Sequence, residues 1–342
     1  NALASISIAS NLIMPLLVFF MGLFMALNPL VAQANGAKRY NKLGEYLRHG
    51  IYVAFLITLP TVFIINHLEP VMQMIGVQPS IIPVVSDYLQ AVSWGILPLF
   101  LFMTLRSVNE GLFSTTPIMF ISLAAIPFNI VLNYIFMYGY LGIPAMGAVG
   151  LGYATAIVWC LIFSLLLIYT LFAKKYQHLV FFRHFHKPDL KVFKEILVIG
   201  IPLSVTIGLE VLMFGAVGLF IGRFSINMIA AHQIALNFAS LVFMVPLGLS
   251  IAISARVGHA VGRNAATDLK RSAFLGILFS VMFMLCALIV TLSITETIVA
   301  IYSNESSVIA ISVQLLHMAA IFMLFDGLQV SASGALRGMK DT

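Results

Sequence analysis

Two acidic residues lie in the middle of long apolar stretches of this sequence. Glu210 is at the centre of the apolar run 196–222, and Asp326 lies inside the run 307–330. A carboxylate at the centre of a bilayer costs about 2.5–3.5 kcal/mol on insertion scales, so such a residue is a functional candidate. The interiors of the apolar runs contain no Lys or Arg that could neutralise either residue. We therefore expect these carboxylates to bind something other than a structural ion-pair partner.

The chemistry open to this pair is cation binding. In a cavity of low dielectric constant, each carboxylate is either neutral with a proton or charged beside Na⁺ or an organic cation. Binding of one cation removes the negative charge that attracts another, so the pair is typical of a cation exchanger. If sodium is the coupling ion, we expect it to bind Glu210 and Asp326. The hypothesis needs Na⁺ or H⁺ but no other cofactor.

Further polar residues follow helical spacing within the apolar runs. Those that share a helical face with one another or with a carboxylate are Asn129 and Asn133, Gln233 and Asn237, Gln329 beside Asp326, and Thr206 beside Glu210. They either line a cavity or form interhelical hydrogen bonds, which are worth about 0.6 kcal/mol each on average. His232 and His317 are interpreted as polar contacts already satisfied by neighbours rather than as ligands.

The composition indicates the elements that must position these residues. Apolar residues make up 61% of the 342 residues and charged residues 9%, against roughly 25% charged in soluble domains. This excludes a water-soluble globular enzyme. A membrane-spanning helix needs about 20 mainly apolar residues. Nine such runs occur, at about 6–32, 49–66, 84–105, 117–138, 149–173, 196–222, 228–254, 273–294 and 307–330. The sequence therefore predicts an all-α polytopic membrane protein with nine transmembrane helices.

The basic residues predict the orientation of these helices. Of the 18 Lys and Arg residues, all but Arg223 lie in or beside the odd-numbered loops. The positive-inside rule makes those loops cytoplasmic and places residue 1 on the outer side. The basic segment 174–194 is then a cytoplasmic linker. The sequence pI of about 9.3 reflects this topology, and we expect no nucleic-acid partner.

An internal repeat predicts the domain organisation. When the chain is shifted by 226 positions, Asn11 and Gly22 fall on Asn237 and Gly248. Six spans separate the copies, so both have the same orientation, as in a parallel repeat.

This repeat predicts two pseudo-symmetric lobes of six helices each. The N-terminal lobe covers 1–173 and the C-terminal lobe 195–342, on either side of the linker. We expect that this chain lacks the first helix of the first lobe and the last two helices of the second.

Four segments carry a resemblance to a known family. They are MALNPLVAQANGAKR (25–39), FNIVLNYIFMYGYLGIPAMGAVGLGYATAI (128–157), AAHQIALNFASLVFMVPLGLSIAISARVGHAVG (230–262) and GALRGMKDT (334–342). In order and content they resemble the multidrug and toxic compound extrusion (MATE) transporters, from the family's second helix to its tenth.

The resemblance also implies roles for particular residues. Glu210 and Asp326 match acidic positions in the seventh and tenth family helices. In this respect the chain resembles the NorM-like branch, in which these positions are implicated in cation and drug binding. Asn129 and Asn133 match the paired asparagines of the fifth family helix. The family's first helix carries a further acidic residue, and this chain does not include that helix.

Together these features predict a secondary active multidrug antiporter. It would export cationic amphipathic small molecules in exchange for Na⁺ or H⁺ by alternating access, as a monomer in the bacterial inner membrane. The alternative is a lipid-linked oligosaccharide flippase of the same architecture. Its anionic substrate calls for Lys or Arg in the spans. The apolar runs contain neither, so the flippase is disfavoured. An enzyme is not expected because the spans lack HExxH and GxSxG motifs. A channel is disfavoured because two solitary acids form no ring around a pore.

Overall fold

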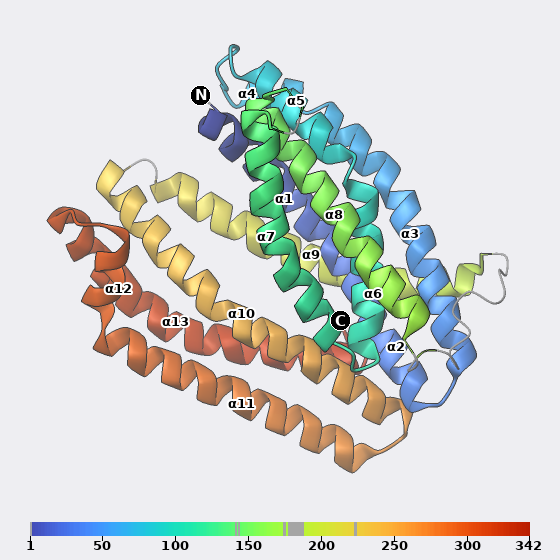
Figure 1. Cartoon of the computed structure of the whole chain (residues 1–342). Helices are drawn as coiled ribbons and strands as arrows, with labels where there is room; N and C mark the ends of the chain where they lie inside the picture. Colours follow the sequence, from blue (N-terminus) through green and yellow to red (C-terminus); the bar gives the residue numbers. More distant parts are fainter. Residues whose placement is uncertain (1, 141, 143, 174–175, 177–187, 222–223) are drawn as a thin grey trace. The chain divides into compact units, whose positions relative to one another are not determined.

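The computed structural model describes all residues except 1, 141, 143, 174–175, 177–187 and 222–223. The described part of the chain forms helices and loops, without strands (Figure 1). Its helices are α1 (Ala2–Met25), α2 (Leu27–Gly36), α3 (Tyr40–Asn66), α4 (Glu69–Met74), α5 (Ile82–Ser93), α6 (Ile96–Gly111), α7 (Thr116–Tyr138), α8 (Gly147–Phe172), α9 (Leu190–Ile221), α10 (Ile226–Gly262), α11 (Ala266–Ser293), α12 (Thr295–Tyr302) and α13 (Ser306–Gly338).

The described helices account for all nine predicted spans. Eight segments are long and apolar enough to cross a membrane, and α5 and α6 together form a ninth that bends by 46°. The bend lies next to Gly95, where an added Cβ would lie 2.7 Å from the Cα of Ala156 in α8. Glycine at this position therefore allows α8 to pack closely against the bend. The prediction of an all-α polytopic membrane protein is confirmed.

Several helices extend beyond the predicted apolar runs. Helix α3 begins at Tyr40 rather than near residue 49, and α10 ends at Gly262 rather than near residue 254. Arg48 and Arg256 consequently lie within helices. The reason is that helical hydrogen bonding continues through polar turns, whereas a count of apolar residues stops at the first charged position.

Contacts divide the chain into two compact units, which we describe separately. The first contains residues 1–35 and 39–208, and the second contains 36–38 and 209–342. The boundary lies inside α9. The predicted division into lobes on either side of a 174–194 linker stays a prediction, because most of that linker, like Arg223, lies outside the described residues.

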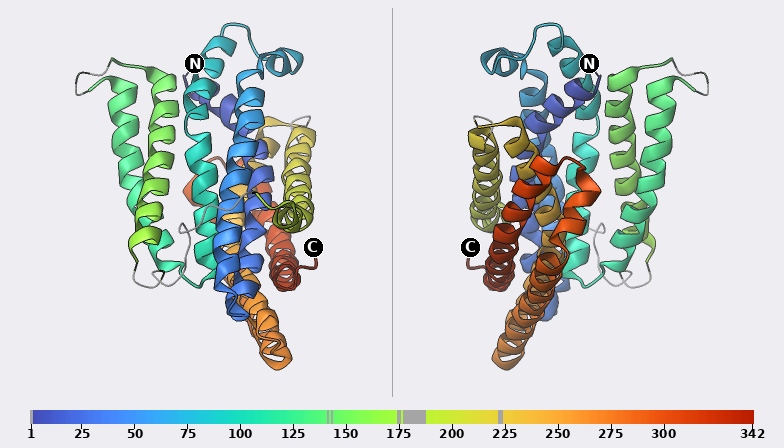
Figure 2. Two further views of the ribbon diagram at one scale, coloured as in Figure 1. Left: turned by 90° about the vertical axis from the view of Figure 1, so that its right-hand side faces the viewer. Right: turned by 90° about the vertical axis from the view of Figure 1, so that its left-hand side faces the viewer.

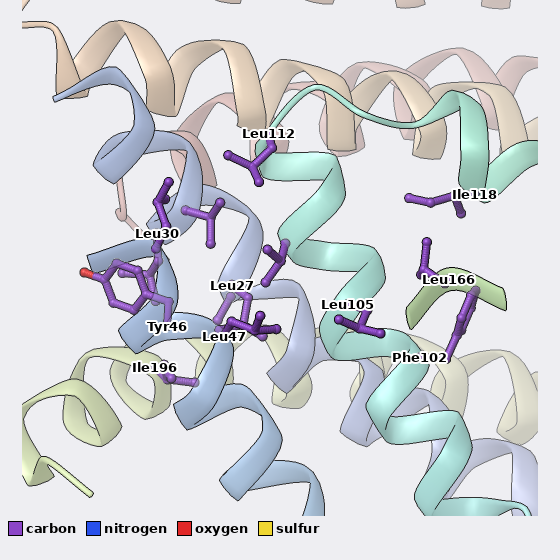
Figure 3. Packing of buried hydrophobic residues seen from close by; sticks show 14 of the residues in the cluster. Leu27, Leu30, Tyr46, Leu47, Phe102, Leu105, Leu112, Ile118, Leu166 and Ile196 are labelled. Carbon is purple, nitrogen blue, oxygen red and sulfur yellow. The ribbon is translucent and has the colours of Figure 1, made fainter. Parts of the chain in front are cut away.

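The first unit has a continuous apolar core between its helices (Figure 3). Leu27, Leu47, Leu105 and Leu166 come from four different helices, and each is at most 1% exposed. Ile196, near the start of α9, packs into the same cluster. The N-terminal part of α9 is thus held in the first unit by ordinary apolar burial.

The second unit is built on α10, α11 and α13, which run side by side (Figures 1 and 2). Helices α10 and α13 make the closest contact. At Gly334 of α13 an added Cβ would lie 2.5 Å from the backbone oxygen of Ser250 in α10. The Ser250 hydroxyl donates to the carbonyl of Val330 over 2.8 Å. Small residues thus allow these two backbones to approach closely, as is common between membrane helices.

Candidate functional site: an acid-lined cavity in the second unit

The second unit contains a cavity of about 530 Å³. Its walls come from α9, α10 and α13. The lining residues are Glu210, Val211 and Phe214 of α9; His232, Gln233, Ala235, Leu236, Asn237, Ala239, Ser240 and Phe243 of α10; and Leu315, Ala319, Phe322, Met323 and Asp326 of α13. This volume is within the usual range for sites that bind drug-sized molecules.

Helical periodicity explains which residues face the cavity. On α13 the lining positions are Leu315, Ala319, the adjacent pair Phe322 and Met323, and Asp326, which together lie on one face of a helix. Leu316 and Ala320, which lie between them, are fully buried in apolar clusters and are not among the described lining residues. The regular backbone of α13 therefore fixes the direction of Asp326.

Glu210 and Asp326 are the two carboxylates of this cavity. Both side chains are half-buried, and because they line one mostly apolar cavity, their charges are expected to repel each other. The described lining includes no Lys or Arg, and in the described part of the chain neither carboxylate forms an ion pair. Two negative charges in a mostly apolar wall attract a positively charged ligand and repel an anion.

Neutral polar groups and aromatic rings complete the cavity wall. Gln233, Asn237 and Ser240 follow one another along α10 and supply amide and hydroxyl oxygens. Phe214 and Phe322 provide ring faces, which attract cations as well as apolar surfaces. The site can therefore combine charge attraction with apolar contact for a large cation.

Two of the residues predicted from helical spacing lie away from this lining. The Thr206 hydroxyl donates to the carbonyl of Pro202 over 2.9 Å, one turn earlier on α9. Gln329 is exposed on α13, one turn past Asp326. Neither is among the described lining residues, so sharing a helical face with a carboxylate did not place them in this cavity.

The predicted asparagine pair lies in the first unit, on α7. The Asn133 side-chain amide donates to the Asn129 oxygen over 2.9 Å. The Asn133 side-chain oxygen is buried without a hydrogen-bond partner in the described part of the chain. A polar atom of this kind is a candidate contact for a ligand. The role of Asn129 and Asn133 in binding stays a prediction.

The interpretation of His232 as a satisfied polar contact is wrong. His232 lines the cavity together with both carboxylates. Its Nε2 atom is buried and has no hydrogen-bond partner among the described residues. The sequence offered one signal, since His232 directly precedes the predicted lining residue Gln233. The spacing alone could not show that its ring nitrogen is left without a partner.

The described residues contain no group of three or more His, Cys, Asp or Glu side chains that could hold a metal ion. A sodium ion prefers oxygen ligands, and the cavity offers two carboxylates with the amide oxygens of Gln233 and Asn237 nearby in its wall. This donor set fits a transiently bound substrate cation better than a resident transition metal, which would favour nitrogen and sulfur ligands.

In the described residues, eight apolar helices and the bent pair α5–α6 define a polytopic membrane protein, and the acid-lined cavity is its candidate small-molecule site. Residues 1–135 and 202–342 match the model of the MatE family. The chain is 38% identical over 339 residues to "Multidrug resistance protein NorM" of Aliivibrio fischeri, covering 99% of this chain and 74% of that relative. The chain belongs to the MatE family, and it is an integral protein of the bacterial inner membrane.

Solved structures support the same fold. The chain superposes on the crystal structure of the eukaryotic MATE transporter AtDTX14 with a TM-score of 0.85 at 20% sequence identity, covering 99% of this chain and 75% of that one. It also superposes on an outward-facing multidrug resistance MATE family transporter with a TM-score of 0.87 at 17% identity, again covering 99% and 75%. At these identities the likeness shows the fold alone.

Proposed function

We propose that this protein is a secondary active antiporter that exports organic cations in exchange for Na⁺ or H⁺ by alternating access. The observation that carries the proposal is the placement of Glu210 and Asp326 in one cavity whose described lining lacks basic residues. The names of its relatives, multidrug resistance proteins NorM and MdtK, support the export of varied compounds.

The physical basis of coupling is competition for the two carboxylates. A proton or Na⁺ neutralises the charge that holds an organic cation. The coupling ion and the organic cation therefore weaken each other's binding to the same carboxylates. The aromatic and apolar wall adds binding energy that depends little on the shape of the ligand. Such a wall suits a transporter of several amphipathic cations better than one of a single substrate.

The alternative function, flipping of a lipid-linked oligosaccharide, is less well supported. An anionic pyrophosphate headgroup would be repelled by Glu210 and Asp326, and it calls for Lys or Arg in the cavity wall. The described lining of this cavity offers no such residue. Transport of a cation therefore agrees better with the electrostatics of the site.

The test is export of the fluorescent cation ethidium from liposomes that contain the purified chain. An inward Na⁺ gradient at constant pH and an inward proton gradient without Na⁺ are imposed separately. Each gradient is repeated with Asp326→Asn and with the matched control Asp268→Asn, an exposed aspartate whose carboxylate lies 3.7 Å from Arg263.

We expect one gradient to drive export, Asp326→Asn to abolish it and Asp268→Asn to leave it unchanged. A response to Na⁺ alone assigns sodium as the coupling ion, and a response to the proton gradient alone assigns H⁺. If neither gradient moves ethidium, or if Asp326→Asn exports normally, the proposed function is wrong.

A further inference from the structure

An apolar groove runs along α9 in the first unit. Its enclosed part has a volume of about 190 Å³ and lies between α1, α3 and α9. Side chains from all three helices line it, among them Leu23, Leu56 and Leu197. The described lining carries no charge, and Ser204 is its one polar residue. This part of the groove therefore suits a hydrocarbon ligand.

A second, shallower recess continues the groove toward the start of α9. It has a volume of about 500 Å³, and its described lining comes from α9 alone, between Leu190 and Pro202. Phe193, Leu197 and Ile201 line both hollows, so the two form one groove. Their spacing of four residues places them in one stripe on a face of the helix.

Lys194 is the charged residue of the described lining. It borders the shallow recess, is exposed and forms no ion pair in the described part of the chain. The neighbouring carboxylate of Glu195 is engaged with α3, where it accepts a hydrogen bond from the Tyr46 hydroxyl over 2.6 Å. Lys191, one turn earlier on α9, is also exposed. The end of the groove near Lys194 therefore attracts an anion.

The length of the groove matches one leaflet of a bilayer. Lys194 and Ser204 are ten positions apart, which is about 15 Å along a helix, and the hydrocarbon core of a bilayer is about 30 Å thick. At Ser204 the backbones of α1 and α9 touch, since an added Cβ at Gly22 would lie 2.6 Å from the Ser204 Cα. A hydrocarbon chain that begins beside Lys194 thus ends near the bilayer midplane.

We propose that this groove binds a phospholipid with an anionic headgroup, with one acyl chain between α1, α3 and α9 and the phosphate beside Lys194. The lipid comes from the leaflet at the N-terminal end of α9, which the positive-inside rule predicts to be the cytoplasmic one. One basic residue near an anionic lipid headgroup is worth about fivefold in affinity. The inference goes beyond the proposed function and does not depend on it.

The chemistry of this groove is the reverse of that of the acid-lined cavity. Glu210 and Asp326 line that cavity without a described Lys or Arg, whereas the described lining of the groove has Lys194 and no acid. The enclosed volume of about 190 Å³ is also below the usual range of about 300–1,000 Å³ for sites that bind drug-sized molecules. An organic cation should therefore bind in the second unit and leave the groove to lipid.

The test is native mass spectrometry of the purified chain, titrated in detergent with phosphatidylglycerol or with phosphatidylcholine of the same acyl chains. Lys194→Gln removes the charge, and its control is Lys270→Gln, an exposed lysine of α11 outside the described lining. Leu56→Trp places a larger side chain in the wall of the enclosed part. Its control is Leu59→Trp, because Leu59 is exposed on the same helix but is not among the described lining residues.

We expect the wild-type chain to bind one phosphatidylglycerol about fivefold more tightly than phosphatidylcholine. Lys194→Gln should remove this preference, because the preference depends on charge. Leu56→Trp should weaken the binding of both lipids about tenfold, the effect of losing apolar contact with about two methylene groups. Both control variants should bind the two lipids as the wild-type chain does.

Equal affinity of the wild-type chain for the two lipids would overturn the inference. So would a preference for phosphatidylglycerol that survives in Lys194→Gln, or one that is lost equally in Lys270→Gln. If Leu56→Trp binds both lipids as tightly as Leu59→Trp, the acyl chain lies elsewhere on the surface. Displacement of the bound phosphatidylglycerol by ethidium would assign the groove to the organic cation instead.

Discussion

Glu210 of α9 and Asp326 of α13 line the same cavity, although α10, α11 and α12 separate them in the sequence. Like charges in one mostly apolar cavity repel each other, and the described lining has no Lys or Arg. The two residues therefore form one electrostatic site rather than two independent ones. This relationship sets what mutations in the site should do.

The carboxylates should act as a unit in transport. We expect Glu210→Gln and Asp326→Asn each to lower gradient-driven ethidium export at least tenfold, roughly the effect of losing 1.4 kcal/mol of cation binding. The double variant should be hardly worse than either single variant, because residues of one site are not additive.

Export rates and the amount of each variant in the membrane are measured together. Both single variants should insert normally into the membrane, since a neutral amide is less costly in the bilayer than a charged carboxylate. Losses that simply multiply in the double variant would show that the two residues act independently.

The apolar wall should select the organic ligand without selecting the coupling ion. Ala319 lines the cavity on α13, and Ala319→Phe fills part of the space with an aromatic ring. We expect ethidium binding to weaken at least tenfold, while a small ion still reaches both carboxylates. Ala310→Phe is the matched control, because Ala310 is an exposed residue of the same helix.

Binding of ethidium and of radioactive Na⁺ to the purified variants separates these effects. Equal losses of both ligands in Ala319→Phe would indicate that the helix has moved rather than that the cavity is smaller. Normal ethidium binding by Ala319→Phe would place the organic ligand outside this cavity.

Close packing of α10 against α13 should depend on Gly334. A Cβ at this position would lie 2.5 Å from the Ser250 backbone oxygen, so the backbones must separate. We expect Gly334→Ala to lower the free energy of unfolding by about 1–3 kcal/mol, the usual cost of overpacking.

Gly248→Ala on α10 is the control, since nothing lies within 4 Å of the added methyl group. It should be neutral or stabilising by up to about 1 kcal/mol, because alanine favours the helix. Both variants are compared by thermal unfolding in detergent. A Gly334→Ala variant as stable as Gly248→Ala would contradict this account of the interface.

The spans and the acid pair could be predicted because each depends on a strong local signal. Apolar runs long enough to cross a bilayer have few alternative structures, and Glu210 and Asp326 are conspicuous because charge at that depth is costly. The short helices α4 and α12, of 6 and 8 residues, gave no such signal because they are too short to span a membrane.

The outline of the cavity could not be predicted, because it depends on how far neighbouring helices extend past one another. Thr206 and Gln329 have suitable spacing from the carboxylates but lie outside the described lining. The place of His232 in the cavity wall, and the lack of a partner for its Nε2 atom among the described residues, depend on packing between helices, which a single sequence does not supply. Helical periodicity gives the direction of a side chain, and only packing between helices decides what it meets.

Tyr176 should couple the stability of the first unit to alkaline pH. Its hydroxyl donates to Asn109 Oδ1 over 2.7 Å, and Asn109 donates in turn to Thr170 over 3.2 Å. Burial raises the pKa of Tyr176 to about 12. We expect Tyr176→Phe at pH 7.5 to lower the free energy of unfolding by about 1 kcal/mol, because Asn109 Oδ1 loses a donor.

At pH 11 the destabilisation caused by Tyr176→Phe should shrink or reverse. The unfolded chain loses the tyrosine proton near pH 10 while the folded chain keeps it until about pH 12. The unfolded state then binds fewer protons than the folded state, so the stability contributed by Tyr176 falls as the pH rises from 10 to 12. Phenylalanine has no proton to lose and escapes this penalty.

The measurement is the denaturant midpoint of both proteins in detergent at pH 7.5 and pH 11. Tyr302→Phe is the control, because Tyr302 is 44% exposed; this variant shows how far alkaline pH destabilises the chain by other routes. A wild-type to Tyr176→Phe difference that is the same at both pH values would mean that the Tyr176 hydroxyl is not held protonated by burial, and the network with Asn109 and Thr170 would then need another explanation.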